Sequence, residues 1–412
     1  MDLLIVIYLI FTFLGFYYLS LFGSIFIQNR KRMFEYFKPN RIYTLSIVVP
    51  CYNGAKVIEG TIENLLKSDY KGLKKIIVVD HCSTDNSYEI IQKCAKKYPQ
   101  VMALRKPENL TGLSAESKNY GAQFVETELI GFTDDDSRPM KDAISNIVGF
   151  FNDEEIGAVT SRVLVKNRNK FLARLQSIEY KIIAFTRKLF GFVDSIYVTN
   201  GPLSIYRRKA FEEIGGFDEK NLTEDIELTW HFIHDGWKVG ISLNSLVYTI
   251  VPDNLRSWIR QRLRWNMGGI QTLIKYKHTF LKKGMLGFFV LPYFVLAWIL
   301  GIFGLGLFIY RISRYILLRY LQTVYSVEAQ TAILRLNDLS FSPSVLFFFG
   351  IILIILGALY NFAALGHSRK ESEEFKREGI FNLVTYMFVY LLLYPVVLVS
   401  SVYKFVKGDR SW

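Results

Sequence analysis

Hydrophobic residues follow two different patterns along this chain. In the first pattern, apolar runs without a charged residue lie at Leu3 to Ile27, Leu286 to Tyr310, Ser344 to Leu365 and Leu383 to Val402. Each run is long enough for a helix to cross a bilayer, which takes ~20 residues. In the second pattern, between residues 41 and 250, short β-rich runs alternate with helical ones. The sequence therefore predicts one N-terminal and about three C-terminal membrane helices attached to an α/β domain.

The first half of the middle region reads as a βαβ progression. Strands are predicted at Ser46 to Pro50, Ile76 to Asp80, Val101 to Leu104 and Leu129 to Thr133, and helices at Val57 to Leu66, Tyr88 to Lys97 and Leu113 to Val125. Strands that alternate with helices favour a parallel sheet with right-handed crossovers. Neither a G-x-G-x-x-G nor a G-x-x-x-x-G-K-[ST] pattern occurs here, so neither a dinucleotide fold nor a P-loop is supported.

The N-terminal run is predicted to remain as a membrane anchor. Asp2 stands where a signal peptide has basic residues, and no small-residue cleavage site follows. Basic residues from Arg30 to Arg41 follow the run, which places the next domain on the cytoplasmic side of a cell membrane. We expect four parts: an anchor with a basic linker (1–40), an α/β domain (41–250), interfacial helices (251–285) and C-terminal membrane helices (286–412).

Composition supports a membrane protein and argues against nucleic acid as a partner. Of the 412 residues, 51% are hydrophobic, which is too many for a wholly soluble chain of this length. The net charge is +13, but no zinc, RRM or helix-turn-helix signature accompanies it, and the basic residues flank apolar segments. Cys51, Cys82 and Cys94 lack paired or metal-type spacing, so a structural role in a reducing compartment is expected.

An acidic cluster marks the end of the last strand predicted in the first half. Asp134, Asp135 and Asp136 follow Thr133 directly, and a Ser-Arg-Pro turn comes next. Adjacent carboxylates repel one another unless a compensating charge is present, and a hard cation such as Mg²⁺ or Mn²⁺ provides it best. Ligands of parallel sheets bind at the carboxyl ends of the strands, where this cluster falls. An acidic loop with a type I turn is the alternative.

Four motifs stand in a characteristic order: Asp80, the cluster ending at Asp136, Thr223-Glu224-Asp225, and Gln261-Arg262-Leu263-Arg264-Trp265, followed by apolar segments. In this order the chain resembles the membrane-embedded family 2 glycosyltransferases over nearly its whole length. That family includes poly-N-acetylglucosamine, hyaluronan and cellulose synthase types and the ceramide glucosyltransferase type. The resemblance implies an α/β GT-A nucleotide-sugar-binding domain, with a mixed sheet and a Rossmann-like first half, plus transmembrane α-helices.

The resemblance assigns several residues to the donor. Tyr52 is expected to stack on the base, and Asp80 to accept from a ring N–H, although Asp80 also suits a helix cap. Asp134 is placed near the ribose and with the metal, and Asp136 on the metal between the phosphates. Arg264 is expected to grip the diphosphate, because a guanidinium makes paired hydrogen bonds.

The same resemblance assigns catalysis and the acceptor. Asp225 is the expected base of an inverting displacement, and Glu224 and Gln261 complete its motifs. Asn200, Gly201 and Trp265 are expected to contact the acceptor. The alternatives are a helix that begins at Thr223, a plain turn at Asn200, and an amphipathic helix from Trp258 to Trp265 in the lipid headgroups.

We therefore expect an inverting, metal-dependent enzyme that moves a sugar, from a UDP-sugar by preference, to a lipid-linked or glycan acceptor at the bilayer. Gly112-Leu113-Ser114 and Lys118-Asn119 resemble single-addition members, whereas Gly54 and His81 depart from the family pattern. A processive polysaccharide synthase is the alternative, and an inactive scaffold a remote one. Four helices make a narrow bundle, so a polymer channel would need a homo-oligomer or a partner subunit.

Overall fold

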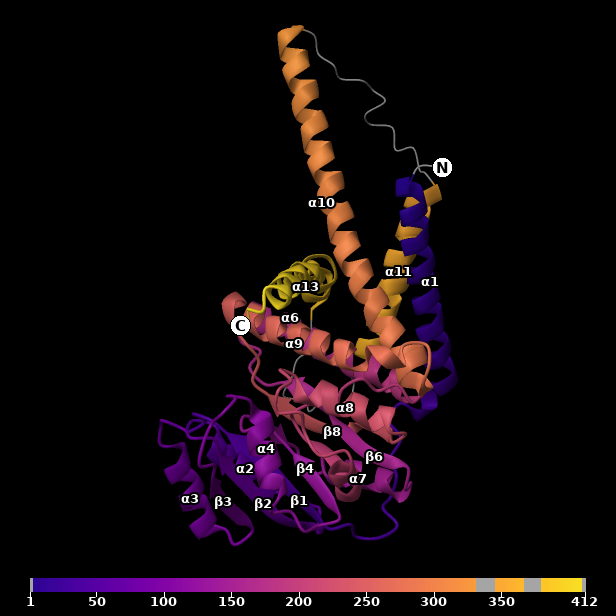
Figure 1. The fold of residues 1–412 in the computed structure, drawn as a ribbon. Helices are drawn as coiled ribbons and strands as arrows, with labels where there is room; N and C mark the ends of the chain where they lie inside the picture. The colour runs from indigo at the N-terminus through magenta and orange to yellow at the C-terminus, as the bar shows by residue number, and fades with distance from the viewer. Residues whose placement is uncertain (1–2, 331–344, 367–378, 410–412) are drawn as a thin grey trace.

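The computed structural model of the protein describes residues 3–330, 345–366 and 379–409, and its centre is an eight-stranded mixed sheet (Figure 1). The strands run in the order β3-β2-β1-β4-β7-β6-β8-β5. Their bounds are β1 Leu45–Cys51, β2 Leu73–Asp80, β3 Val101–Arg105, β4 Leu129–Phe132, β5 Arg138–Pro139, β6 Ile156–Val165, β7 Ser204–Arg207 and β8 Lys238–Thr249.

The first half has the parallel order that the sequence predicted. Every residue of β1 is buried, because helices cover both faces of this part of the sheet. The register pairs Cys51 at the end of β1 with Asp80 at the end of β2, and Val48 with Phe132 of β4. The carboxyl ends of these strands therefore lie at one edge, which brings Tyr52, His81 and the acidic cluster together.

The second half adds strands of the opposite direction to the same sheet. β7 pairs antiparallel with both β4 and β6, while β6 and β8 pair parallel. Ser204 pairs with Phe132, and the Leu203 N–H donates to Thr133 Oγ1 at 3.3 Å. The loop before β7, which contains Asn200 and Gly201, is therefore fixed beside the acidic cluster.

Helices cover the sheet and continue into an apolar assembly. Those of the sheet domain are α2 Ile58–Leu66, α3 Ser87–Lys97, α4 Ser114–Ala122, α5 Ser145–Val148, η2 Gly149–Asn152, α6 Phe171–Gly191, α7 Arg208–Glu213 and α8 Glu224–His234. The others are α1 Leu3–Asn29, η1 Arg30–Arg32, α9 Leu255–Tyr276, η3 Lys277–Thr279, η4 Leu286–Val290, α10 Leu291–Glu328, α11 Val345–Gly366, α12 Ile380–Thr385, η6 Tyr386–Tyr390 and α13 Leu391–Val406.

Four helical segments of the described residues are long and apolar enough to cross a membrane: Ile5–Arg32, Leu286–Glu328, Phe349–Gly366 and Ile380–Val406. They confirm the four apolar runs as candidate spans. The helix after Leu286 is longer than the predicted apolar run, which ended at Tyr310, because α10 continues to Glu328. Residues 311–328 contain neither glycine nor proline, so the charged positions do not interrupt the helix. Residues 331–344 lie outside the described residues.

Two helices lie between the sheet and the apolar helices. In Figure 1, α6 and α9 lie above the sheet, and α1, α10 and α11 rise from this layer. The aromatic rings of Phe22, Phe190 and Tyr293 pack together and join α1, α6 and α10. α6 and α9 therefore form the roof of the strand-end edge and its junction with the apolar helices.

Candidate functional site

A cavity of about 610 Å³ opens at the strand-end edge beneath α6 and α9. Most of the residues that the sequence singled out line it: Tyr52, Asp134, Asp136, Asn200, Gly201, Glu224, Asp225, Gln261, Arg264 and Trp265. Asp80 is the exception. The cavity walls also contain residues that the sequence analysis did not assign, above all Lys118, Ser114, Arg187 and Tyr197.

The acidic cluster forms one wall, and its three carboxylates have different surroundings. Asp134 lies against Gly201, where a Cβ would overlap its Oδ2, and 3.9 Å from Lys118 Nζ. Asp135 accepts from the Cys51 thiol and the Tyr52 backbone N–H, and it leaves no room for a side chain at Gly54. Asp136 accepts from Thr249 Oγ1 at 3.3 Å. All three aspartates line the cavity, and the middle one is in addition held by the β1 loop.

Electrostatics at this wall suit a divalent cation. Burial first, and then repulsion from Asp134, raises the pKa of Asp135 to about 6. Burial and repulsion from Asp134 and Asp135 raise the pKa of Asp136 to about 7. No group of three acidic, histidine or cysteine side chains in the described ranges forms a complete metal cage. Mg²⁺ and Mn²⁺ bind through one or two carboxylates and take further ligands from water and phosphate, so Asp134 and Asp136 could hold such an ion.

Tyr52 and Asp80 end adjacent strands but differ in exposure. The Tyr52 ring is 54% exposed at the cavity and 6.4 Å from the His81 ring, so one of its faces is available for stacking. Asp80 is fully buried, lies 3.3 Å from Arg105 Nε and accepts from the Ser83 N–H. Asp80 thus holds the turn after β2 and does not cap a helix, since α3 begins at Ser87 with Asn86 at its N-cap. Its Oδ1 has no hydrogen-bond partner.

The start of α8 is bound to the first half of the sheet domain. Glu224 Oε1 accepts from Lys118 Nζ at 2.8 Å and from Ser114 Oγ at 2.6 Å. Burial opposes ionisation of Glu224, but the adjacent Lys118 outweighs it and lowers the pKa of this carboxyl. Asp225 lacks such a partner, so burial and the charge of Glu224 raise its pKa. The neighbouring carboxylates are therefore different: one is a fixed anion, and the other is able to take up a proton near neutral pH.

α9 contributes the cation of the opposite wall. Arg264, Trp265 and Gln261 face the cavity. Arg262, which the sequence grouped with the headgroup-facing residues, is instead 1% exposed and lies 2.6 Å from Glu179 Oε2 of α6. Tyr390 donates to the same oxygen at 2.5 Å, and Arg262 Nε donates to the hydroxyl of Tyr394 at 2.9 Å. This buried network joins α6 and α9 to the last apolar helix.

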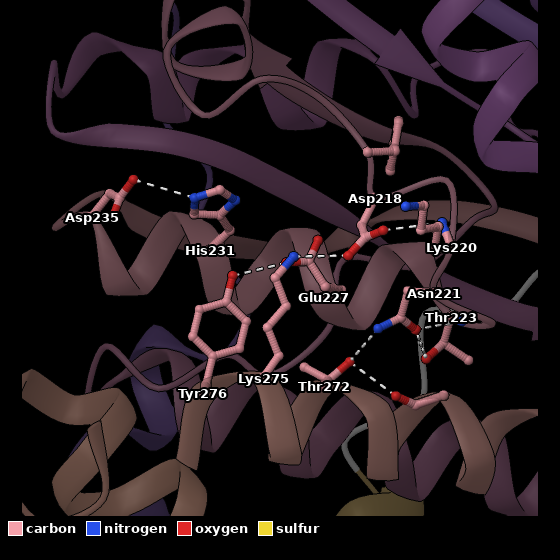
Figure 2. Close-up of polar contacts among 12 residues, drawn as sticks. Asp218, Lys220, Asn221, Thr223, Glu227, His231, Asp235, Thr272, Lys275 and Tyr276 are labelled. Carbon is pink, nitrogen blue, oxygen red and sulfur yellow. Dashed lines mark hydrogen bonds and ion pairs between the residues drawn. The ribbon is translucent and has the colours of Figure 1, made fainter. Parts of the chain in front are cut away.

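A second network joins α9 to α8 and is shown in Figure 2. Glu227 Oε1 accepts from the Tyr276 hydroxyl at 2.8 Å and lies 2.7 Å from Lys275 Nζ. Lys275 also lies 2.8 Å from Asp218, and Thr272 accepts from Asn221 at 3.0 Å. The loop that leads into Glu224 and Asp225 is therefore tied to the helix that contains Arg264.

The two histidines of α8 both contact the carboxyl group of Asp235. His231 lies 3.5 Å from Asp235, and His234 is 2.6 Å from the same carboxyl group. These two contacts lie at the C-terminal end of α8, which ends at His234.

Asn200 and Gly201 line the cavity, but the Asn200 side chain is largely engaged. Its backbone N–H donates to Thr160 Oγ1 at 3.0 Å and its Nδ2 to the Ser161 carbonyl at 2.8 Å. Asn200 Oδ1 is left without a partner. The loop thus supports Asp134 and keeps one acceptor atom free.

Lys118 and Arg187 are the main residues that sequence reasoning missed. The sequence noted Lys118 only as part of a stretch that resembles single-addition members. Lys118 is 2% exposed and its partner Glu224 is distant in sequence, so no local pattern predicted their ion pair. Arg187 did have a signal: it follows Tyr180, Ile183 and Ala184 at helical spacing, and is the one charged residue of this group.

Comparisons with known proteins agree with this site. A family model described as "Glycosyltransferase like family 2" matches residues 40–268. Poly-beta-1,6-N-acetyl-D-glucosamine synthases of Staphylococcus aureus and Staphylococcus epidermidis are 25% identical over 249 residues, which are 60% of this chain and 60% of each relative. The chain thus spans about 60% of the length of these curated relatives.

One solved structure resembles almost the whole molecule. It is a mannosyltransferase from Pyrobaculum calidifontis in complex with GDP-Man and Mn²⁺, with a TM-score of 0.55, 16% identity, and coverage of 95% of this chain and 97% of that chain. With the mixed sheet, this likeness confirms the GT-A fold.

Proposed function

This chain is a member of glycosyltransferase family 2, and from that premise we propose that it transfers a sugar from a nucleotide-sugar donor to a membrane-associated acceptor, with inversion. The observation that carries the proposal is that one cavity is lined by the acidic cluster, by Arg264 of α9 and by Asp225 of α8. A UDP-sugar is the favoured donor.

The donor would lie along the strand ends. The exposed ring of Tyr52 would stack on the base, and the unpartnered Asp80 Oδ1 would accept from a ring N–H if the Arg105 side chain moves. Arg264 would make paired hydrogen bonds to the diphosphate. Asp134 lies against Gly201 and near Lys118. From this position it would contact the ribose and share the metal with Asp136.

Asp136, with Asp134, would hold a divalent cation. The raised pKa of Asp136 supports this, because burial and the charges of Asp134 and Asp135 disfavour its ionised form. A bound cation would offset that negative charge. When bound, Mg²⁺ or Mn²⁺ supplies a fixed positive charge that stabilises the leaving diphosphate.

Asp225 would take the proton from the attacking acceptor hydroxyl. Its raised pKa brings it closer to the working pH, where a general base is most effective. The described cavity offers no second carboxylate nucleophile that is free of another contact, so a single displacement with inversion is the simpler reaction. Glu224 stays ionised on Lys118 and holds α8 in place.

The acceptor would enter from the side of the roof. Trp265, Gly201 and the free Asn200 Oδ1 line that part of the cavity. We propose that the catalytic domain (41–250) lies on the cytoplasmic face of the cell membrane, with interfacial helices (251–285) between it and the membrane segments (1–40 and 286–412).

A processive polysaccharide synthase is the second candidate function. It is favoured by the names of the Staphylococcus relatives, which are polymer synthases. Size analysis of the radiolabelled product separates the two: a single or short addition supports the first candidate, and a high-molecular-weight smear supports the second.

The proposed transfer is tested by incubating the purified protein and lipid extract with UDP-, GDP- and dTDP-sugars and measuring released nucleotide. We expect one donor to be used by the wild type and Asp225→Asn to lose turnover while it still binds that donor. Asp235→Asn, at the far end of the same helix, is the matched control and should keep its activity. Normal turnover in Asp225→Asn would remove the base assignment, and no released nucleotide from any donor would reject the function.

A further inference from the structure

One buried cation in the cavity has no role in the transfer described above. Arg187 of α6 is 8% exposed and lines the cavity. Its Nε is buried and has no hydrogen-bond partner. Within residues 3–330, 345–366 and 379–409, no carboxylate forms an ion pair with it. Its described partner is Tyr197, whose ring lies 5.8 Å from the guanidinium carbon and whose hydroxyl accepts a hydrogen bond from the guanidinium.

An unpaired buried guanidinium is unfavourable for the protein alone. Burial lowers the pKa of Arg187, although Tyr197 and Asp225 oppose this. Arginine nevertheless remains charged at neutral pH, so the free-energy cost of burying the guanidinium is not removed by loss of a proton. A buried charge costs free energy unless it is paired. A ligand anion is the partner that this position lacks.

The wall around Arg187 is apolar and adjoins the membrane helices. Tyr180, Ile183, Ala184 and Arg187 follow one another at helical spacing along α6 and all line the cavity. The other side of α6 packs against α11, where the hydroxyls of Thr186 and Tyr360 are 2.6 Å apart. A ligand that reaches Arg187 therefore meets an apolar surface one helix away from the membrane segment.

We propose that Arg187 binds a phosphate group on the acceptor, and that the apolar chain of this acceptor lies along Tyr180, Ile183 and Ala184. The inference rests on the proposed function and names its acceptor class, a phosphate-bearing lipid. A guanidinium forms paired hydrogen bonds with phosphate, which a neutral lipid cannot supply. The donor diphosphate is already assigned to Arg264 on α9. Asp225 and Arg187 line the same cavity, so the bound acceptor would lie within reach of the base.

The binding step is tested on the full chain in a neutral detergent, dodecyl maltoside, with no donor present. The probes are dodecyl phosphate, dodecanol and inorganic phosphate, and the measurements are the shift in Tm and the Kd. The variants are Arg187→Met and Arg187→Lys. Arg174→Met, which removes the same charge from an exposed position of α6, is the matched control.

We expect dodecyl phosphate, but not dodecanol, to raise the Tm of the wild type and of Arg174→Met. Arg187→Met should bind it at least ~10-fold more weakly, because the paired charge-assisted hydrogen bonds are lost. The affinity of Arg187→Lys for dodecyl phosphate should lie between those of the wild type and Arg187→Met. Without ligand, Arg187→Met should be at least as stable as the wild type, since it removes an unpaired buried charge. A merely structural arginine would show the opposite change in stability.

Equal responses of Arg187→Met and the wild type, or an equal response to dodecanol, would overturn the proposal. Inorganic phosphate that binds as tightly as dodecyl phosphate would keep the phosphate contact and overturn the lipid source. If Arg187→Met does not fold, Arg187→Lys must still show weaker binding. The binding measurement uses no donor, so it is independent of the nucleotide-release assay. Dodecyl phosphate binding through Arg187 without nucleotide release from any donor would reject the proposed transfer and keep this site. Nucleotide release without dodecyl phosphate binding would reject this site and keep the transfer.

Discussion

Lys118 Nζ lies 2.8 Å from Glu224 Oε1, although 106 residues separate them, and both side chains are almost fully buried. This ion pair links α4 of the first half to the start of α8, where Asp225 follows directly. The position of the proposed base therefore depends on a residue that has no chemical role of its own in the transfer.

Replacing Lys118 with Met should destabilise the protein by about 3–5 kcal/mol, because Glu224 would be left buried and unpaired. The double variant Lys118→Met/Glu224→Gln should recover much of the Tm but little activity, since α8 would no longer be held by a charge. Thermal unfolding and nucleotide release measure the two effects. A double variant as unstable as Lys118→Met would contradict the pairing argument.

Metal binding should weaken as the pH falls through about 7. Asp136 has its pKa raised to about 7, and a proton competes with the cation for this carboxylate. Titration with Mn²⁺ followed by electron paramagnetic resonance should give a higher Kd at pH 6 than at pH 8. Asp136→Asn should bind weakly at both values, and an unchanged wild-type Kd would remove Asp136 from the metal site.

Asp136 should also make the stability of the metal-free protein depend on pH. An unfolded Asp has a pKa of about 3.9, below the folded value, so the stability it contributes is full below about pH 4 and is lost as the pH rises through about 7. Asp136→Asn should therefore be stabilised relative to the wild type more at pH 8 than at pH 5. The comparison of their Tm values at the two pH values checks the sign.

Replacing Arg264 with Lys should weaken nucleoside diphosphate binding roughly tenfold, because a point charge cannot form the paired hydrogen bonds of a guanidinium. Arg260→Lys is the control, since Arg260 is exposed on the same helix. Calorimetric titration with UDP and GDP gives the affinities. Unchanged affinity in Arg264→Lys would leave α9 with an interfacial role only.

The ties of Lys275 to Asp218 and Glu227 should matter for turnover more than for folding (Figure 2). Lys275 is 44% exposed, so water screens its ion pairs and Lys275→Met should cost only about 1 kcal/mol. The loss of turnover in Lys275→Met should be larger than this small loss of stability explains, because the loop before Asp225 is no longer bound to α9. Lys275→Arg should restore it, and the exposed Lys277→Met should behave as the wild type. Equal activity in both Met variants would count against this coupling.

The last apolar helix should keep its C-terminus on the side of the catalytic domain. The central Tyr390 and Tyr394 bond to Glu179 and Arg262 of the roof, so this helix lies beside α9 rather than apart from the domain. A basic tail on the cytoplasmic side also satisfies the charge rule that four crossings would violate.

Cysteine labelling of sealed vesicles checks this arrangement in a Cys82→Ser background. Lys407→Cys should react like Lys71→Cys of the catalytic domain and unlike Gln330→Cys at the far end of α10. Labelling of Lys407→Cys from the same side as Gln330→Cys would establish a fourth crossing.

The sequence by itself determined the elements and the chemical types. Alternating β-rich and helical runs were enough for the parallel first half, and uncharged runs for the four apolar helices, because these signals depend only on neighbouring residues. It also placed the acidic cluster at a strand end, where a parallel sheet gathers its ligands.

Only the tertiary structure decided which charged residues meet. Arg262 and Arg264 are two positions apart, so they face nearly opposite sides of a helix, and the sequence could not tell which side was buried. Contact with Glu179 buries Arg262 and leaves Arg264 to the cavity. Likewise, Lys118 holds Glu224 and leaves the pKa of Asp225 raised, and Arg187 enters the cavity unpaired. These outcomes arise from long-range packing between the two halves and the roof, for which no local pattern exists.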